Sequence, residues 1–152
     1  MHENFDCTQF ITFNSQKEYK EIIEKINSIF SDLSFKIVES SNIKVVKRNY
    51  YKDFWDKYCF ELEDSEFLGD FYDWKDKSNP PLSIKLFCEA IFKLMNSIEM
   101  TSIKVIICSF ADITKTQNSF VKVDKDMLLD EMFSMSINSF ICPENLIIEL
   151  EF

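Results

Sequence analysis

The sequence predicts a single α/β (α+β) domain over residues 1–152, in which about three helices pack on a mixed β-sheet. Segments with strand-like alternation and segments with helix-like periodicity follow one another along the chain. No repeat or Gly/Ser-rich linker divides the 152 residues, and their 46% hydrophobic content suffices for one core. Because strands occur on both sides of helices, we expect a layer of sheet and a layer of helices.

The first segments are a strand and a helix. Phe10–Phe13 is an apolar run of strand type, and Ser15 and Glu18 have the S-x-x-E spacing of a capping box. A helix over 16–30 is therefore expected. Its apolar residues fall on one stripe: Tyr19, Ile22, Ile23, Ile26 and Phe30.

Three strands are expected next. Segments 35–38 and 43–47 are joined by a polar turn. Tyr58–Glu63 alternates strictly between apolar and other residues, so its two aromatic residues and its leucine are expected in the core. Glu61 and Glu63 are expected to face solvent.

The remaining elements follow a break at residues 78–81, where two prolines are adjacent. The run 103–108 is almost continuously apolar, which is typical of a central strand. In chain order we expect a helix over 82–98, which should be the most buried one, strands over 103–108 and 120–123, a short helix over 125–134 that Asp124 caps, and a strand over 148–152.

The composition excludes several kinds of enzyme. His2 is the only histidine and Gly69 the only glycine. The chain therefore has no internal imidazole for a nucleophilic relay, no cluster of histidine ligands for a metal and no glycine-rich loop for a phosphate. The five cysteines are an odd number without a C-x-x-C pair, as expected of free thiols in a reduced compartment. We predict a non-enzymatic cytoplasmic protein without a cofactor.

The charge indicates the kind of partner. A net charge of -9 and a pI near 4.6 repel nucleic acid and anionic membranes. The first six residues carry no basic segment, and no apolar run approaches the roughly 18 residues of a membrane span. A basic protein is therefore the expected partner, rather than nucleic acid or a membrane.

The acid is concentrated between residues 53 and 76. This segment holds nine acidic and two basic residues, together with eight aromatic residues that include both tryptophans. Carboxylates attract a basic partner over a distance, and Trp and Tyr supply the desolvated area that holds it. The candidate contact residues are Asp53, Trp55, Asp56, Glu61, Glu63, Asp70, Asp73 and Trp74.

A structural interpretation of the same segment stays open. Some of its residues have helical spacing and can form the buried stripe of a short helix: Phe67, Leu68, Phe71 and Trp74. Cations of the preceding predicted strand can neutralise Glu61 and Glu63 across a hairpin. These cations are Lys44, Lys47 and Arg48.

Two other functions remain as alternatives. Asp70, Asp73 and Asp76 recur at i,i+3 spacing, which leaves a carboxylate- or metal-dependent hydrolase open, although the ligand order of an EF-hand is absent. The 16 phenylalanines can instead line the pocket of an adaptor or ligand-binding module.

Four features of the chain together form a distinctive profile. They are its small size, its acidity, its scarcity of glycine and its acidic aromatic stretches Asp53–Asp56 and Asp70–Trp74. This profile resembles that of bacterial immunity proteins, particularly those that protect against contact-dependent growth inhibition toxins. The resemblance implies a stoichiometric inhibitor that forms a tight complex with a cognate toxin, often a basic nuclease, and blocks its active site or substrate surface. The strand order and the oligomeric state are not predicted.

Overall fold

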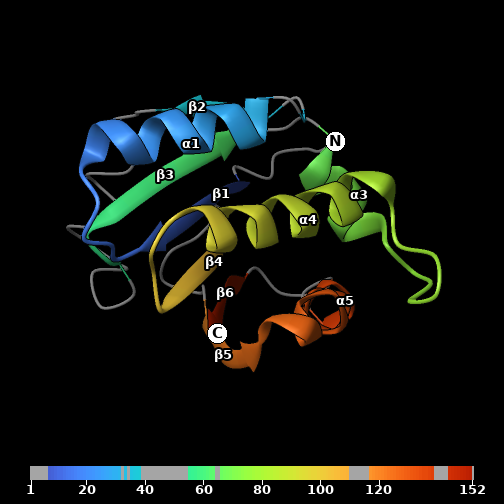
Figure 1. The fold of residues 1–152 in the computed structure, drawn as a ribbon. Coiled ribbons are helices and arrows are strands. Elements are labelled where there is room, and N and C mark those ends of the chain that lie inside the picture. The colour runs from blue at the N-terminus through green and yellow to red at the C-terminus, as the bar shows by residue number, and fades with distance from the viewer. Residues whose placement is uncertain are drawn as a thin grey trace.

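The computed structural model describes residues 7–31, 33, 35–38, 55–63, 66–109, 117–138 and 144–151. These residues form one six-stranded mixed sheet with helices packed on one of its faces (Figure 1). The predicted fold class is confirmed, although four α-helices rather than about three are present among the described residues. The predicted strand over 43–47 lies outside them.

The helices and strands follow one another with short connections in most of the described chain. In order they are β1 (Cys7–Phe13), α1 (Tyr19–Ser31), β2 (Lys36–Val38), β3 (Tyr58–Glu63), α3 (Phe67–Asp73), α4 (Leu82–Ser97), β4 (Ser102–Ser109), β5 (Gln117–Asp124), the 3-10 turn η2 (Lys125–Met127), α5 (Leu128–Asn138) and β6 (Glu144–Glu151).

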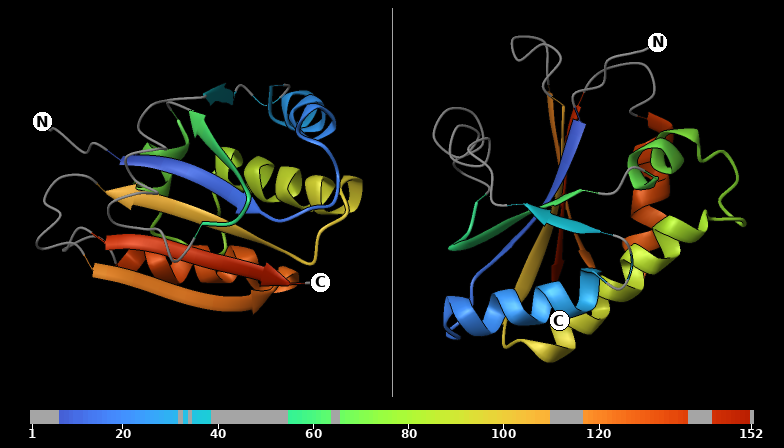
Figure 2. Two further views of the ribbon diagram at one scale, coloured as in Figure 1. Left: turned by 90° about the vertical axis from the view of Figure 1, so that its left-hand side faces the viewer. Right: turned by 90° about the horizontal axis from the view of Figure 1, so that it is seen from above.

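The strand order is β2-β3-β1-β4-β6-β5. Neighbouring strands are antiparallel except β5 and β6, which run parallel and are connected through α5. A parallel pair needs such a crossover because its second strand must restart at the same end of the sheet. Seen along the sheet, α1, α3, α4 and α5 all lie on the same side (Figure 2).

Side chains alternate between the two faces of the sheet. Ile11 of β1 lies between Phe60 of β3 and Val105 of β4, and all three pack into the core beneath the helices. The residues that alternate with them point to the opposite side, which we call the helix-free face because none of the described helices covers it. On β1, β3, β4 and β6, the residues of this face include Phe10, Thr12, Glu61, Lys104, Ile106, Ile147 and Glu149.

Helix α1 has the predicted buried stripe but begins later than expected. Ile22, Ile26 and Phe30 are buried, whereas Tyr19 is 45% exposed. The predicted capping box is wrong: the Ser15 hydroxyl accepts the backbone N–H of Lys17 at 3.2 Å, in a local turn that precedes the helix. Short polar side chains readily form such turns in competition with a helix start.

The remaining helices bury most of the residues that their periodicity indicated, although Leu68 of α3 and Leu86 of α4 are only partly buried. In α3, Phe67 and Phe71 are buried, as is Trp74 at its C-terminal end. Helix α4 has a broad buried side, which contains Ile84, Phe87, Cys88, Ala90, Ile91, Leu94 and Met95. The short helix predicted over 125–134 is split into η2 and α5, and Asp124 makes no side-chain capping bond.

Strand β3 confirms its predicted alternation but contradicts the predicted exposure of Glu61. Tyr58, Phe60 and Leu62 are buried in the core, and Glu63 is exposed. Glu61 was expected to face solvent but is only 5% exposed. It points to the helix-free face beside Phe10, and at this position that face is itself shielded from solvent.

Candidate binding surface

The residues predicted to form one contact face are divided between two places. Trp55, Asp56 and Glu61 lie on the helix-free side of the sheet, as their contacts with β1 and β4 show. Glu63 lies on the same side, two residues after Glu61 in β3. On the helix-bearing side, α3 and its C-terminal end carry the remaining described candidates, which are Asp70, Asp73 and Trp74. Asp53 lies outside the described residues. The structure therefore does not bring these described candidates together.

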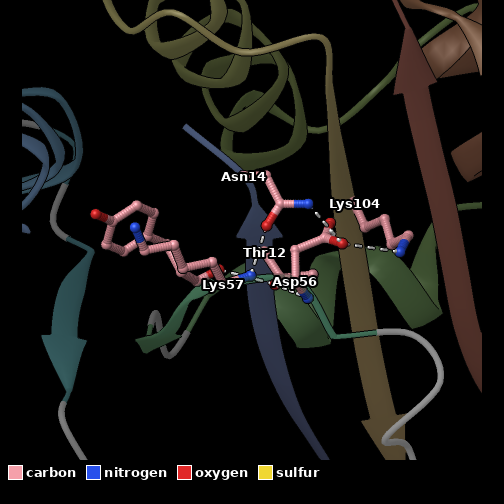
Figure 3. A network of polar contacts seen from close by, with 6 residues as sticks. Thr12, Asn14, Asp56, Lys57 and Lys104 are labelled. Carbon is pink, nitrogen blue, oxygen red and sulfur yellow. Dashed lines mark hydrogen bonds and ion pairs between the residues drawn. The ribbon is translucent and has the colours of Figure 1, made fainter. Parts of the chain in front are cut away.

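On the helix-free side, Asp56 is the centre of a polar network (Figure 3). Its carboxylate accepts a hydrogen bond from Asn14 Nδ2 at 3.3 Å and lies 3.5 Å from Lys104 Nζ. The side chains of this ion pair are only 13% exposed for Lys104 and 19% for Asp56. Their attraction is therefore screened less than that of a pair on the open surface.

The backbone around Asp56 is held by two side chains of the β1 end. The N–H of Asp56 donates to Thr12 Oγ1 at 2.9 Å, and the N–H of Lys57 donates to Asn14 Oδ1 at 2.8 Å. Thr12 in turn donates its hydroxyl to the Tyr58 carbonyl at 2.8 Å. These hydrogen bonds hold residues 55–57 across β1, just before β3 begins. We call residues 55–57 the strap.

Trp55 lies within this strap against the sheet. Its ring meets Phe10 edge-on at a centroid distance of 5.1 Å. Its indole Nε1 is buried and has no hydrogen-bond partner among the residues that the structure describes. A buried N–H without an acceptor is uncommon in proteins, because it loses water and gains nothing in exchange.

On the helix-bearing side, the three candidates differ in exposure. Asp70 is half-buried and accepts the Ser83 hydroxyl at 2.6 Å, so it connects α3 to the first turn of α4. Asp73 is exposed. Trp74 is only 3% exposed and donates its indole N–H to the Asp76 carbonyl at 2.7 Å. Trp74 thus occupies a core position, as the structural interpretation of the segment expected.

A second acidic segment lies beside α3, although 50 residues separate them in sequence. The Trp74 ring meets Phe133 of α5 at 4.9 Å, and Lys77 lies 3.4 Å from Asp130. Segments 66–77 and 124–131 together hold eight acidic and three basic residues, a net charge of -5. We call the following residues the α3–α5 acidic surface: Glu66, Asp73, Asp76, Asp126, Asp130 and Glu131.

Charges elsewhere in the described chain are closer to balance. Residues 17–25, which include the first half of α1, contain three acidic and three basic residues, and Lys17 pairs with Glu21 at 3.8 Å. At the edge of the sheet, Lys122 pairs with Glu151 at 3.3 Å. The two segments that contribute the α3–α5 acidic surface therefore carry a net charge of -5, whereas residues 17–25 carry none.

Sequence reasoning missed the part of this surface that comes from α5. A count along the chain does show four acids and one base within 124–131. It does not show that the crossover from β5 to β6 places this segment beside α3. That juxtaposition depends on the pairing of the strands, which the sequence did not predict.

Two observations bear on metal binding and on thiol chemistry in the described part of the chain. They contain no group of three or more His, Cys, Asp or Glu side chains that could hold a metal ion. Burial, and secondarily the neighbouring Glu89, raises the pKa of the Cys88 thiol to about 12. The thiol is therefore protonated at neutral pH, and it donates to Met132 Sδ at 3.7 Å.

The described residues thus form a two-layer α/β sandwich in which α1, α3, α4 and α5 lie on the same face of the sheet. Comparison with protein-family models, with curated proteins and with solved structures gives no match. Among the helices that the structure describes, none has both the length and the apolar character that crossing a membrane requires.

Proposed function

We propose that this protein is a stoichiometric binding protein that neutralises a basic partner, a cognate toxin domain of nuclease type, by covering its active site or substrate surface. The α3–α5 acidic surface is the observation that supports the proposal. A patch of carboxylates has the charge to enter a cleft built for phosphate. The resemblance to immunity proteins supplies the class of partner.

The structure changes which residues we assign to the contact. Because Trp74 lies in the core and Asp70 is occupied by Ser83, neither is suited to be a surface anchor. Exposed carboxylates of both acidic segments, such as Asp73 and Asp126, take their place. We expect an interaction that is steered by charge and that depends strongly on salt concentration.

The partner can be sought in the gene next to that of this chain, where we expect a large secreted protein with a toxic C-terminal domain. Co-expression of the chain should restore growth of cells that produce this domain, and the purified proteins should form a one-to-one complex. Absence of both protection and a complex would refute the proposed function.

Charge reversal then tests the surface. Asp73→Lys with Asp126→Lys should slow association with the toxin domain roughly tenfold or more at low salt. The matched control is Glu24→Lys with Glu99→Lys, which changes the net charge equally at exposed positions outside this surface. Equal effects of the two double variants would show that only net charge matters and would remove the surface from the proposal.

A further inference from the structure

We propose that the strap, residues 55–57, opens from the helix-free face as a local unit while the sheet stays folded. Its latch is the network of polar contacts around Asp56 (Figure 3). In the closed state Trp55 covers Phe10, and opening releases the indole from this contact. The inference does not depend on the proposed function.

The closed strap depends on side chains rather than on strand pairing. Strand β3 begins at Tyr58, so the N–H groups of Asp56 and Lys57 precede its ladder. Their acceptors are the hydroxyl of Thr12 and the amide oxygen of Asn14. A segment with few backbone partners opens at a lower free energy than the strands beside it.

Two opposing contributions set the position of this equilibrium. The closed state is favoured by the contacts of Asp56 with Asn14 and Lys104, by the hydrogen bonds of the strap's N–H groups and by the ring contact of Trp55 with Phe10. The indole N–H of Trp55 favours the open state, because it is buried without an acceptor and regains a hydrogen bond to water on opening. A surface turn without such a buried donor would have only the contacts that favour the closed state.

Amide hydrogen exchange of the full-length protein, measured by NMR, separates local opening from global unfolding. The Asp56 amide is the reporter of the strap, and the Ile106 amide in β4 is the reporter of the sheet. In the unmodified protein we expect the Asp56 amide to exchange faster than by global unfolding, at a rate that denaturant hardly changes.

Loosening the latch should act on the strap alone. We expect Lys104→Met and, separately, Asn14→Ala to speed exchange at Asp56 roughly tenfold without an equal change at Ile106, since neither variant removes the acceptor of the Asp56 amide. The control is Lys122→Met, which removes the ion pair with Glu151 at another position. It should leave exchange at Asp56 unchanged.

Removing the unpaired N–H should act in the opposite direction. Replacement of Trp55 by 3-benzothienylalanine keeps the bicyclic shape and has sulfur in place of the N–H. We expect exchange at Asp56 to slow roughly fivefold, because the closed state no longer buries an unsatisfied donor.

Two results would overturn the proposal. One is exchange at Asp56 that matches Ile106 in every variant, since the strap would then open only when the whole domain unfolds. The other is an equal response to Lys104→Met and Lys122→Met, since the latch would then have no special role. Asn14 is exposed, so Asn14→Ala keeps the test available if Lys104→Met fails to fold.

Discussion

Gln9 and Thr12 are both buried polar residues of β1, but they differ in their hydrogen bonds. Gln9 is 1% exposed and Thr12 is fully buried. The Thr12 hydroxyl has two partners, whereas neither amide atom of Gln9 has one within the described part of the chain. Gln9 lies on the helix-covered face, level with Leu62 and Ile107, where the surroundings are apolar. Its amide therefore reduces the stability of the fold.

Replacing this amide should stabilise the protein. Gln9→Met has a similar shape and no unsatisfied polar atoms, so we expect the free energy of unfolding to rise by about 1 kcal/mol. The comparison is Thr12→Val, which leaves the Asp56 N–H without its acceptor. We expect this variant to lower the free energy of unfolding by roughly 1–3 kcal/mol. Urea unfolding measures both. A loss of stability in Gln9→Met would mean that the amide has an interaction that the native state needs.

The buried thiol of Cys88 predicts a dependence on alkaline pH. Its pKa rises from an ordinary value of 9.0 to about 12 in the folded state, mainly through burial. The folded protein then holds this proton more tightly than the unfolded chain, so the stabilisation is complete below pH 9 and is lost as the pH rises toward 12. Urea unfolding should show a shallower decline over this range in Cys88→Ala, and parallel curves would contradict the assignment.

At the scale of elements, one hydrogen bond connects two helices. The Ser83 hydroxyl in the first turn of α4 donates to the carboxylate of Asp70 in α3 at 2.6 Å. The carboxylate is charged and half-buried, so this bond is stronger than an ordinary one between exposed groups. Asp70 therefore helps to hold α3 against α4, and this structural role does not depend on a binding partner.

A double-mutant cycle tests this role of Asp70. We expect Asp70→Ala and Ser83→Ala each to lower the free energy of unfolding by about 1–2 kcal/mol, with a coupling energy near 1 kcal/mol. Asp73→Ala, at an exposed site on the same helix, should change stability by less than about 0.5 kcal/mol. Additive effects of the two variants would show that the bond contributes nothing.

The sequence predicted the elements well where one physical pattern dominated. The alternation of Tyr58, Phe60 and Leu62 identifies β3, and the spacing of Ile22, Ile26 and Phe30 identifies α1, because each pattern depends only on local geometry. The S-x-x-E signal at the start of α1 failed because the Ser15 hydroxyl has an equally local alternative in the N–H of Lys17.

The candidate site was less predictable, because exposure and proximity are tertiary properties. Alternation correctly places Glu61 on the face away from the helices, but it cannot tell whether that face is shielded. Trp55 and Trp74 lie in the same acidic segment, yet one contacts Phe10 and the other contacts Phe133 in the opposite layer. The arrangement of the strands, which no local pattern reveals, separates them.

For the whole molecule, the uneven distribution of charge has an energetic effect even without a partner. The net charge is -9, and segments 66–77 and 124–131 account for -5 of it. Like charges held together in the folded state repel one another. Salt weakens this repulsion, with a screening length of roughly 10 Å at 0.1 M. The folded state is therefore less stable at low ionic strength than its core would allow.

Salt should raise the melting temperature of the protein between 20 and 300 mM NaCl, roughly by a few degrees. The rise should be smaller in Asp73→Lys with Asp126→Lys, which adds positive charge to the α3–α5 acidic surface. Glu24→Lys with Glu99→Lys changes the net charge by the same amount and should retain more of the rise. Differential scanning calorimetry measures all three, and a melting temperature independent of salt would contradict this account.

The position of β4 between β1 and β6 has a consequence during protein synthesis. The neighbouring strands β1, β4 and β6 come from the beginning, the later part and the end of the described chain. While the ribosome still holds residues 144–151, β4 lacks one of its two neighbours and β5 has no strand to pair with. A nascent chain of this fold therefore completes the core beside β4 only after translation has passed β6, and until then it exposes the apolar edge of β4.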